Sequence, residues 1–102
     1  MYKFKEYHSN KALTDVFVEP IDIWVRIDEN LEYCIVFEDS ANNKYDLYTK
    51  DRLLYYKLVD AIINKSVFDS NELVVMNESH FSEDCSDMRN YVMDNYNICK
   101  ED

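Results

Sequence analysis

Apolar and polar residues in the middle of the chain follow the two-residue period of β-strands. Every second residue between 21 and 27 is apolar, which predicts a strand with one buried face. Residues 33–37 are continuously apolar and predict a strand buried on both faces. Residues 45–49 supply a third strand. Short polar turns separate these segments, so we predict a three-stranded antiparallel meander over residues 21–49.

Two later segments follow the helical period. Asp51 is a good N-cap for a helix from Arg52 to about Lys65, and we expect this helix to pack on the meander. The sheet face that it should cover consists of Ile21, Ile23, Val25, Ile35, Phe37 and Leu47. A second apolar stripe, at spacings of three and four, predicts a C-terminal helix that Ser82 caps; it consists of Phe81, Cys85, Met88, Val92, Tyr96 and Cys99.

Two segments are open to alternatives. Residues 1–20 fit either an N-terminal strand or a short helix, and Pro20 marks the point where the chain enters the sheet. Residues 67–76 fit a short helix or a fourth strand, and their clustered β-branched residues favour a strand at residues 73–76. We therefore predict one α+β domain over residues 1–102. It has a three- or four-stranded antiparallel meander, a central helix packed on it, and a C-terminal acidic amphipathic helix.

Composition narrows the class of partner. The chain has 102 residues with 47% hydrophobic and 15% aromatic, enough apolar mass to fold. It has no glycine, so its turns depend on residues such as Asn and Asp. Its net charge is −10, and residues 69–102 carry nine acids against two bases. That balance argues against binding nucleic acid or an anionic membrane directly, and favours either solubility or a basic partner.

The cysteines and histidines offer little chemistry. Three cysteines without CxxC spacing predict neither a disulfide framework nor a structural zinc site, which fits a reducing cytoplasm. Two histidines are too few for a His-rich metal site, so we expect no metal and no cofactor. His80 lies five residues before Cys85, but Cys85 falls on the apolar stripe and is expected to be a core residue. We therefore predict that the protein is not an enzyme. The sequence has neither a signal-peptide pattern nor a membrane span.

The back of the predicted C-terminal helix is acidic. At spacings of three and four it presents Glu83, Asp87, Asn90, Asp94, Asn97 and Glu101. Like charges one turn apart repel, so a helix built only for stability would interleave lysines. The carboxylates are spaced comparably to adjacent phosphates of a nucleic-acid strand. A surface that binds a phosphate backbone is therefore a possible partner for this face, with Glu83, Asp84, Asp87 and Asp94 as contact residues. The alternative is a face that is merely solvated.

A second candidate contact surface lies on the other face of the meander. Trp24 and Tyr48 are expected near Val36, with Arg26 beside them and Asp22 and Asp46 at the flanks. Trp, Tyr and Arg are typical of interface hot spots. The alternative is that the N-terminal segment or the last helix covers this face as a second core layer.

The order of elements resembles that of known inhibitors. Residues 21–49, the helix after Asp51 and the acids Glu78, Glu83, Asp84, Asp87 and Asp94 are similar to small phage-encoded inhibitors of the type II-A anti-CRISPR kind. This resemblance implies a non-enzymatic protein in a bacterial host cell that occupies a basic nucleic-acid-binding surface of a Cas9-type or other host nuclease. The alternatives are an immunity protein that neutralises a nuclease toxin and a small dimeric interaction or regulatory module.

Overall fold

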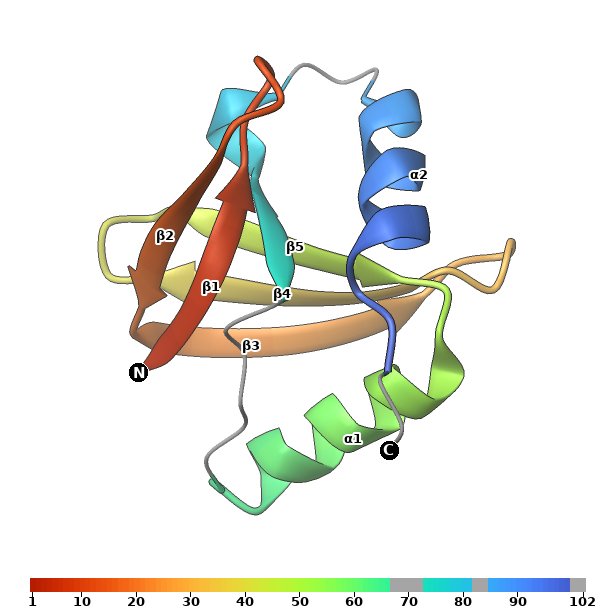
Figure 1. Ribbon diagram of the computed structural model, residues 1–102. Helices are drawn as coiled ribbons and strands as arrows, with labels where there is room; N and C mark the ends of the chain where they lie inside the picture. The colour runs from red at the N-terminus through yellow and green to blue at the C-terminus, as the bar shows by residue number, and fades with distance from the viewer. Residues whose placement is uncertain (67–72, 82–84, 100–102) are drawn as a thin grey trace.

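The computed structural model describes residues 1–66, 73–81 and 85–99, and within these ranges the chain forms six strands and two α-helices. The α+β class is confirmed. The elements in chain order are β1 Tyr2–Tyr7, β2 Leu13–Val18, β3 Pro20–Ile27, β4 Tyr33–Asp39, β5 Lys44–Thr49, α1 Arg52–Ile63, β6 Val74–Asn77, the short 3₁₀ helix η1 Glu78–His80, and α2 Ser86–Asn95 (Figure 1).

The sheet is larger than predicted and it is mixed. Its strand order is β2-β1-β6-β5-β4-β3. The pairing β3–β4–β5 is the expected antiparallel meander. It makes up only half of the sheet, so the predicted total of three or four strands was wrong. The other half consists of the antiparallel hairpin β1–β2 and of β6, which pairs parallel with β1. Within residues 1–20, segments 2–7 and 13–18 thus form strands, and β6 begins within the predicted segment 73–76.

The hairpin turns of the meander are made without glycine. In the β3–β4 turn, Asp28 Oδ1 accepts hydrogen bonds from the backbone N–H groups of Asn30 and Glu32 at 2.9 and 3.0 Å. Leu31 there takes a φ of 59°. The β4–β5 turn has a φ of 66° at Asn42, as the tolerance of Asn for this conformation predicts.

The two helices pack on opposite faces of the sheet (Figure 1). Each helix and the sheet face beneath it form one core layer, named here the α1 layer and the α2 layer. Neighbouring side chains of a strand point to opposite faces, so Val75 of β6 belongs to the α1 layer and Val74 to the α2 layer. The buried residues of the α1 layer are Phe4, Val18, Tyr33, Ile35, Phe37, Tyr45, Leu47, Leu54, Tyr55, Leu58, Leu73 and Val75. Those of the α2 layer are Tyr7, Val74, Met76 and Val92. Strand β4 is buried on both faces over residues 33–37, as predicted.

The position of α1 corrects the predicted sheet face. Ile21 and Val25 were expected beneath this helix, but they are 68% and 44% exposed. Both lie on β3, the edge strand, whereas α1 packs against β5 near the middle of the sheet. The buried members of the predicted face are Ile35, Phe37 and Leu47, with Ile23 partly buried. Asp51 caps α1 as predicted, accepting from the N–H groups of Leu53 and Leu54.

The C-terminal helix is shorter than predicted. It begins at Ser86, after Cys85, and the predicted cap Ser82 lies outside the described residues. It ends at Asn95, so Tyr96 and Cys99 follow the helix rather than extend it. None of the helices in the described part of the chain is long and apolar enough to cross a membrane.

Candidate functional site

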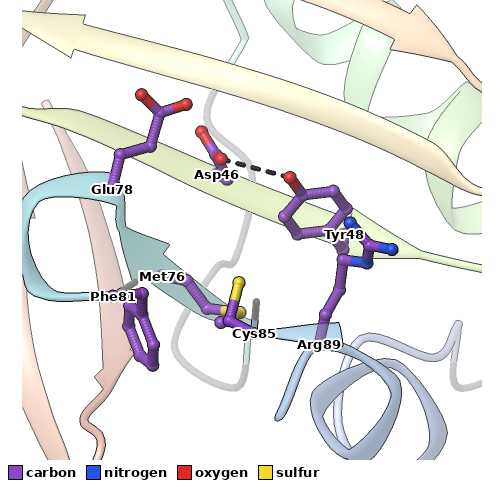
Figure 2. Close-up of a pocket in the computed structure, with 7 residues that line it drawn as sticks. All are labelled: Asp46, Tyr48, Met76, Glu78, Phe81, Cys85 and Arg89. Carbon is purple, nitrogen blue, oxygen red and sulfur yellow. Dashed lines mark hydrogen bonds between the residues drawn. The ribbon is translucent and has the colours of Figure 1, made fainter. Parts of the chain in front are cut away.

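A pocket of about 260 Å³ lies between β5, the β6–η1 segment and α2 (Figure 2). Strand β5 contributes two polar residues, and α2 with the residue before it contributes a thiol and a guanidinium. The lining residues are Asp46, Tyr48, Met76, Glu78, Phe81, Cys85 and Arg89. The pocket therefore has acidic, basic and apolar parts, supplied by segments that are far apart in the sequence.

Local structure explains why these side chains converge. Asp46 and Tyr48 are two residues apart on β5, so they point to the same face. The antiparallel pairing of β5 with β6 places Met76 opposite Asp46. Directly after β6, the Asn77 side chain accepts from the Ser79 N–H at 3.0 Å and starts η1, which carries Glu78 to the rim.

Tyr48 is the centre of the polar contacts in the pocket. Its hydroxyl accepts from Arg26 at 3.1 Å and donates to Asp46 Oδ2 at 3.2 Å (Figure 2). Burial raises the pKa of Tyr48 above its usual 10.0, so the hydroxyl keeps its proton at neutral pH. The guanidinium of Arg89 lies over the Tyr48 ring, 5.1 Å from its centroid, and 3.6 Å from the Glu32 carboxylate. These contacts link α2 to β5 and to the β3–β4 turn.

Asp46 is the unusual group of the pocket. Its residue is only 6% exposed, and Oδ1 is buried with no hydrogen-bond partner among the described residues. Burial, reinforced by the neighbouring Glu78 carboxyl, raises the pKa of Asp46 from 3.8 to about 7. The carboxyl therefore keeps its proton to a higher pH than an exposed aspartate does. A positive charge in the pocket favours the ionised form, and binding of such a group would release a proton.

This arrangement can bind a cationic side chain. The methylenes of a lysine or arginine can pack on Met76 and Phe81, while its charged end meets Asp46 and Glu78. A nucleophilic site is less well supported. His80 is five residues before Cys85 in the sequence, but it does not line the pocket with Cys85, and its Nδ1 lies 2.8 Å from Glu6 Oε2.

The second candidate contact surface, predicted around Trp24 and Tyr48, is only partly assembled. Arg26 and Tyr48 are joined by a hydrogen bond, as described above. Val36 is fully buried. Trp24 is partly buried and has the Lys44 ammonium 5.8 Å from its ring centroid. Its cross-strand partner is Val36, whereas that of Arg26 is Cys34. Because Tyr48 is partly buried and packs against the α2 layer, it belongs to a second core layer, whereas Arg26 is exposed and Trp24 is only partly buried.

Only part of the predicted acidic face lies within the described residues. Glu83 and Asp84 lie outside the described residues. Asp87 and Asp94 are exposed on α2, with Lys50 Nζ 3.5 Å from Asp94 Oδ1. Asn97, expected on the same face, is 1% exposed and belongs to the core. The reason is that α2 ends at Asn95, so the helical spacing does not extend to this residue.

Sequence reasoning missed Glu78 and Arg89 as neighbours of Tyr48, and it placed Asp46 only at a flank. The alternation along β5 was the available signal for Asp46, since it puts Asp46 and Tyr48 on one face. No sequence pattern predicts that η1 and α2 lie against this face of β5. Comparisons with models of protein families, with curated proteins and with solved structures found no match.

Proposed function

We propose that this protein is a non-enzymatic inhibitor that binds a basic nucleic-acid-binding surface of another protein, such as a Cas9-type or other host nuclease. One observation carries the proposal. In a chain with net charge −10, the buried Asp46 carboxylate has an oxygen without a hydrogen-bond partner among the described residues and lines an open pocket beside exposed Glu78. The pocket is suited to one lysine or arginine of the partner.

The exposed acids of α2 supply the second part of the contact. Asp87 and Asp94 lie on the helix that also delivers Arg89 to the pocket. Nucleic-acid-binding surfaces are rich in Lys and Arg, so an acidic protein is attracted to them over long range and associates faster at low salt. A basic side chain in the pocket then fixes the orientation, because charge-assisted hydrogen bonds are directional.

The first experiment identifies and competes with the partner. The protein is used to capture proteins from a bacterial lysate, and the captured protein is purified. We expect a basic nucleic-acid-binding protein whose nucleic-acid binding and whose binding to this chain exclude each other. A partner that binds nucleic acid and this chain simultaneously would contradict the proposal.

The second experiment tests the contact residues. Glu78→Lys should weaken binding at least about tenfold, because it places a like charge beside the incoming cation. Glu29→Lys is the matched control, since Glu29 is exposed in the β3–β4 turn and undergoes the same change of charge. Equal effects of the two substitutions would show that only net charge matters and would remove the pocket from the mechanism.

A third measurement tests the helix. Asp87→Lys combined with Asp94→Lys should weaken binding more than Glu19→Lys combined with Asp60→Lys, a pair of exposed acids of which Asp60 lies on α1, at the opposite face of the sheet. Binding should also weaken as salt rises from about 50 to 300 mM, because salt screens exposed charges. Binding that is insensitive both to salt and to the α2 reversals would refute the electrostatic mechanism.

The immunity-protein alternative uses the same contacts and differs in its target, a nuclease toxin. Inhibition of a purified toxin encoded beside this gene would favour it.

A dimeric interaction module is favoured by a different observation. The edge strand β3 exposes Ile21, Val25 and Ile27, and an apolar edge can pair with another strand. Sedimentation over a wide concentration range tests this alternative. A monomer at every concentration would exclude it, and a dimer dispersed by Val25→Lys would support it.

A further inference from the structure

A buried carboxylate and the two histidines of the chain meet where β1 ends. Glu6 is 5% exposed, and His8 lies two residues after it in the sequence. His80 arrives from the end of η1. One ligand atom from each of these three residues lies within 4.8 Å of the other two. This group, here named the Glu6–His8–His80 cluster, was not visible in the sequence because His80 is 72 residues from His8.

The fold fixes this meeting through strand pairing. Strand β6 pairs parallel with β1, with Val75 opposite Glu6, so the segment after β6 continues past the end of β1. On the other side, the tight β1–β2 hairpin holds His8, whose backbone N–H donates to the Ala12 carbonyl at 2.9 Å. The two strands that flank β1, β2 and β6, thus hold the cluster in place.

One ring nitrogen of each histidine lies near the same carboxylate oxygen. Glu6 Oε2 lies 2.8 Å from His80 Nδ1 and 3.4 Å from His8 Nδ1. The other nitrogen of His8, Nε2, is 2.7 Å from the Thr14 hydroxyl on β2. When Nε2 of a neutral ring donates its proton to Thr14, Nδ1, which lies 3.4 Å from Glu6 Oε2, carries the lone pair that a metal needs. Such a second-sphere hydrogen bond is a regular feature of histidines that bind metals.

We propose that the Glu6–His8–His80 cluster binds a divalent transition metal, and that Zn²⁺ is its occupant. Two imidazoles and one carboxylate suit Zn²⁺, which binds nitrogen at about 2.0–2.1 Å and carboxylate oxygen at about 2.0–2.2 Å. In a tetrahedral site of these bond lengths, ligand atoms lie about 3.3 Å apart. The 3.4 Å between Glu6 Oε2 and His8 Nδ1 already matches this value.

Binding requires a movement of His80, whose ligand atom lies within 4.8 Å of those of Glu6 and His8. Its Nδ1 must move about 0.5 Å away from Glu6 Oε2 to reach that spacing. The His80 side chain is 50% exposed and lies at the end of a three-residue helix, so such a shift disturbs little packing. Three protein ligands leave a fourth tetrahedral position for water or for a side chain of a partner protein.

Zinc titration of the untagged protein, in competition with a chromophoric chelator, tests the proposal. We expect one equivalent of Zn²⁺ per chain, a rise in Tm on adding Zn²⁺, and a loss of about 100-fold in affinity on His80→Gln. Thr14→Val should weaken binding about tenfold by removing the second-sphere contact. His80→Gln is the decisive ligand variant, because His80 is half exposed and its replacement leaves the core intact.

Thiols also bind Zn²⁺, so the control is Cys85→Ser combined with Cys99→Ser, which should leave the affinity unchanged. Failure of the wild-type chain to bind Zn²⁺ would overturn the proposal. So would a stoichiometric site that survives His80→Gln or disappears with the two cysteines. None of these measurements involves the proposed nuclease partner, so the two proposals stand or fall separately.

Discussion

The side-chain amide of Asn97 pairs with both backbone groups of Val74. Its Oδ1 accepts from the Val74 N–H at 2.8 Å, and its Nδ2 donates to the Val74 carbonyl at 2.9 Å and to the Tyr48 carbonyl at 2.7 Å. The β5–β6 register pairs residues 45 and 46 with 77 and 76. Beyond these pairs, the Asn97 amide bridges β5 and β6. This one side chain thereby joins the segment after α2 to two strands of the sheet.

Replacement of Asn97 by alanine should lower the free energy of unfolding by about 2–4 kcal/mol, because it leaves buried backbone groups of Val74 and Tyr48 without partners. Urea denaturation measures this change. The control is Asn95→Ala, since Asn95 is an exposed amide in α2 and should change stability by no more than about 0.5 kcal/mol. Similar values for both variants would mean that the Asn97 contacts contribute little.

Asp51 has two separable roles, one for each oxygen. Its Oδ1 accepts from the N–H groups of Leu53 and Leu54 at the start of α1, and Oδ2 accepts from the Cys99 N–H at 2.6 Å. Asp51→Ala removes both contacts and should cost about 2 kcal/mol. Asp51→Asn can keep the cap and loses the acceptor for Cys99, so it should cost about 1 kcal/mol. Thermal and urea unfolding of the two variants test this order, which an equal loss would contradict.

The raised pKa of Asp46 makes stability depend on pH. The pKa is about 7 in the folded chain against an ordinary value of 3.8, so between these values the folded state holds more protons than the unfolded state. Stability from this group is therefore present below about pH 4 and is lost as pH rises to about 7. Asp46→Asn has no charge to bury, so its stability relative to wild type should increase from pH 4 to pH 8. Chemical denaturation at several pH values would reveal a flat difference if this account were wrong.

Glu78→Gln checks the second cause of that shift. The Glu78 carboxyl raises the pKa of Asp46, so removing its charge should lower the pKa of Asp46 and move the pH transition to lower values. Carboxyl carbon chemical shifts measured by NMR report the midpoint directly. An unchanged midpoint would leave burial as the sole cause.

The exposed acids of α2 are expected to contribute little to stability. Asp94 pairs with Lys50 across 3.5 Å, but both side chains are at least half exposed. Such surface pairs stabilise proteins by about 0–1 kcal/mol. Asp87→Asn and Asp94→Asn should therefore each change the free energy of unfolding by less than about 1 kcal/mol in urea denaturation. A larger loss would assign these acids a structural role and weaken their proposed role in partner binding.

The sequence by itself determined the elements with strong local patterns. The alternation through Ile23 and the continuous apolar run ending at Phe37 identified two strands of the meander, and Asp51 identified the start of α1, because periodicity and capping depend on neighbours in the chain. Residues 1–20 were ambiguous, since short strands carry a weak signal. Their strand state is fixed by pairing of β1 with β6, whose residues lie about 70 positions away.

Only the tertiary structure decided which polar residues meet. Asn97 looked like part of a solvated helical face, yet the helix ends two residues earlier and places its amide between Tyr48 and Val74. Asp46 and Glu78 converge in a pocket through the β5–β6 pairing, and Glu6 and His80 through β1–β6. Long-range pairing of strands carries no period along the chain, so the sequence specified the strands without revealing the sites that they assemble.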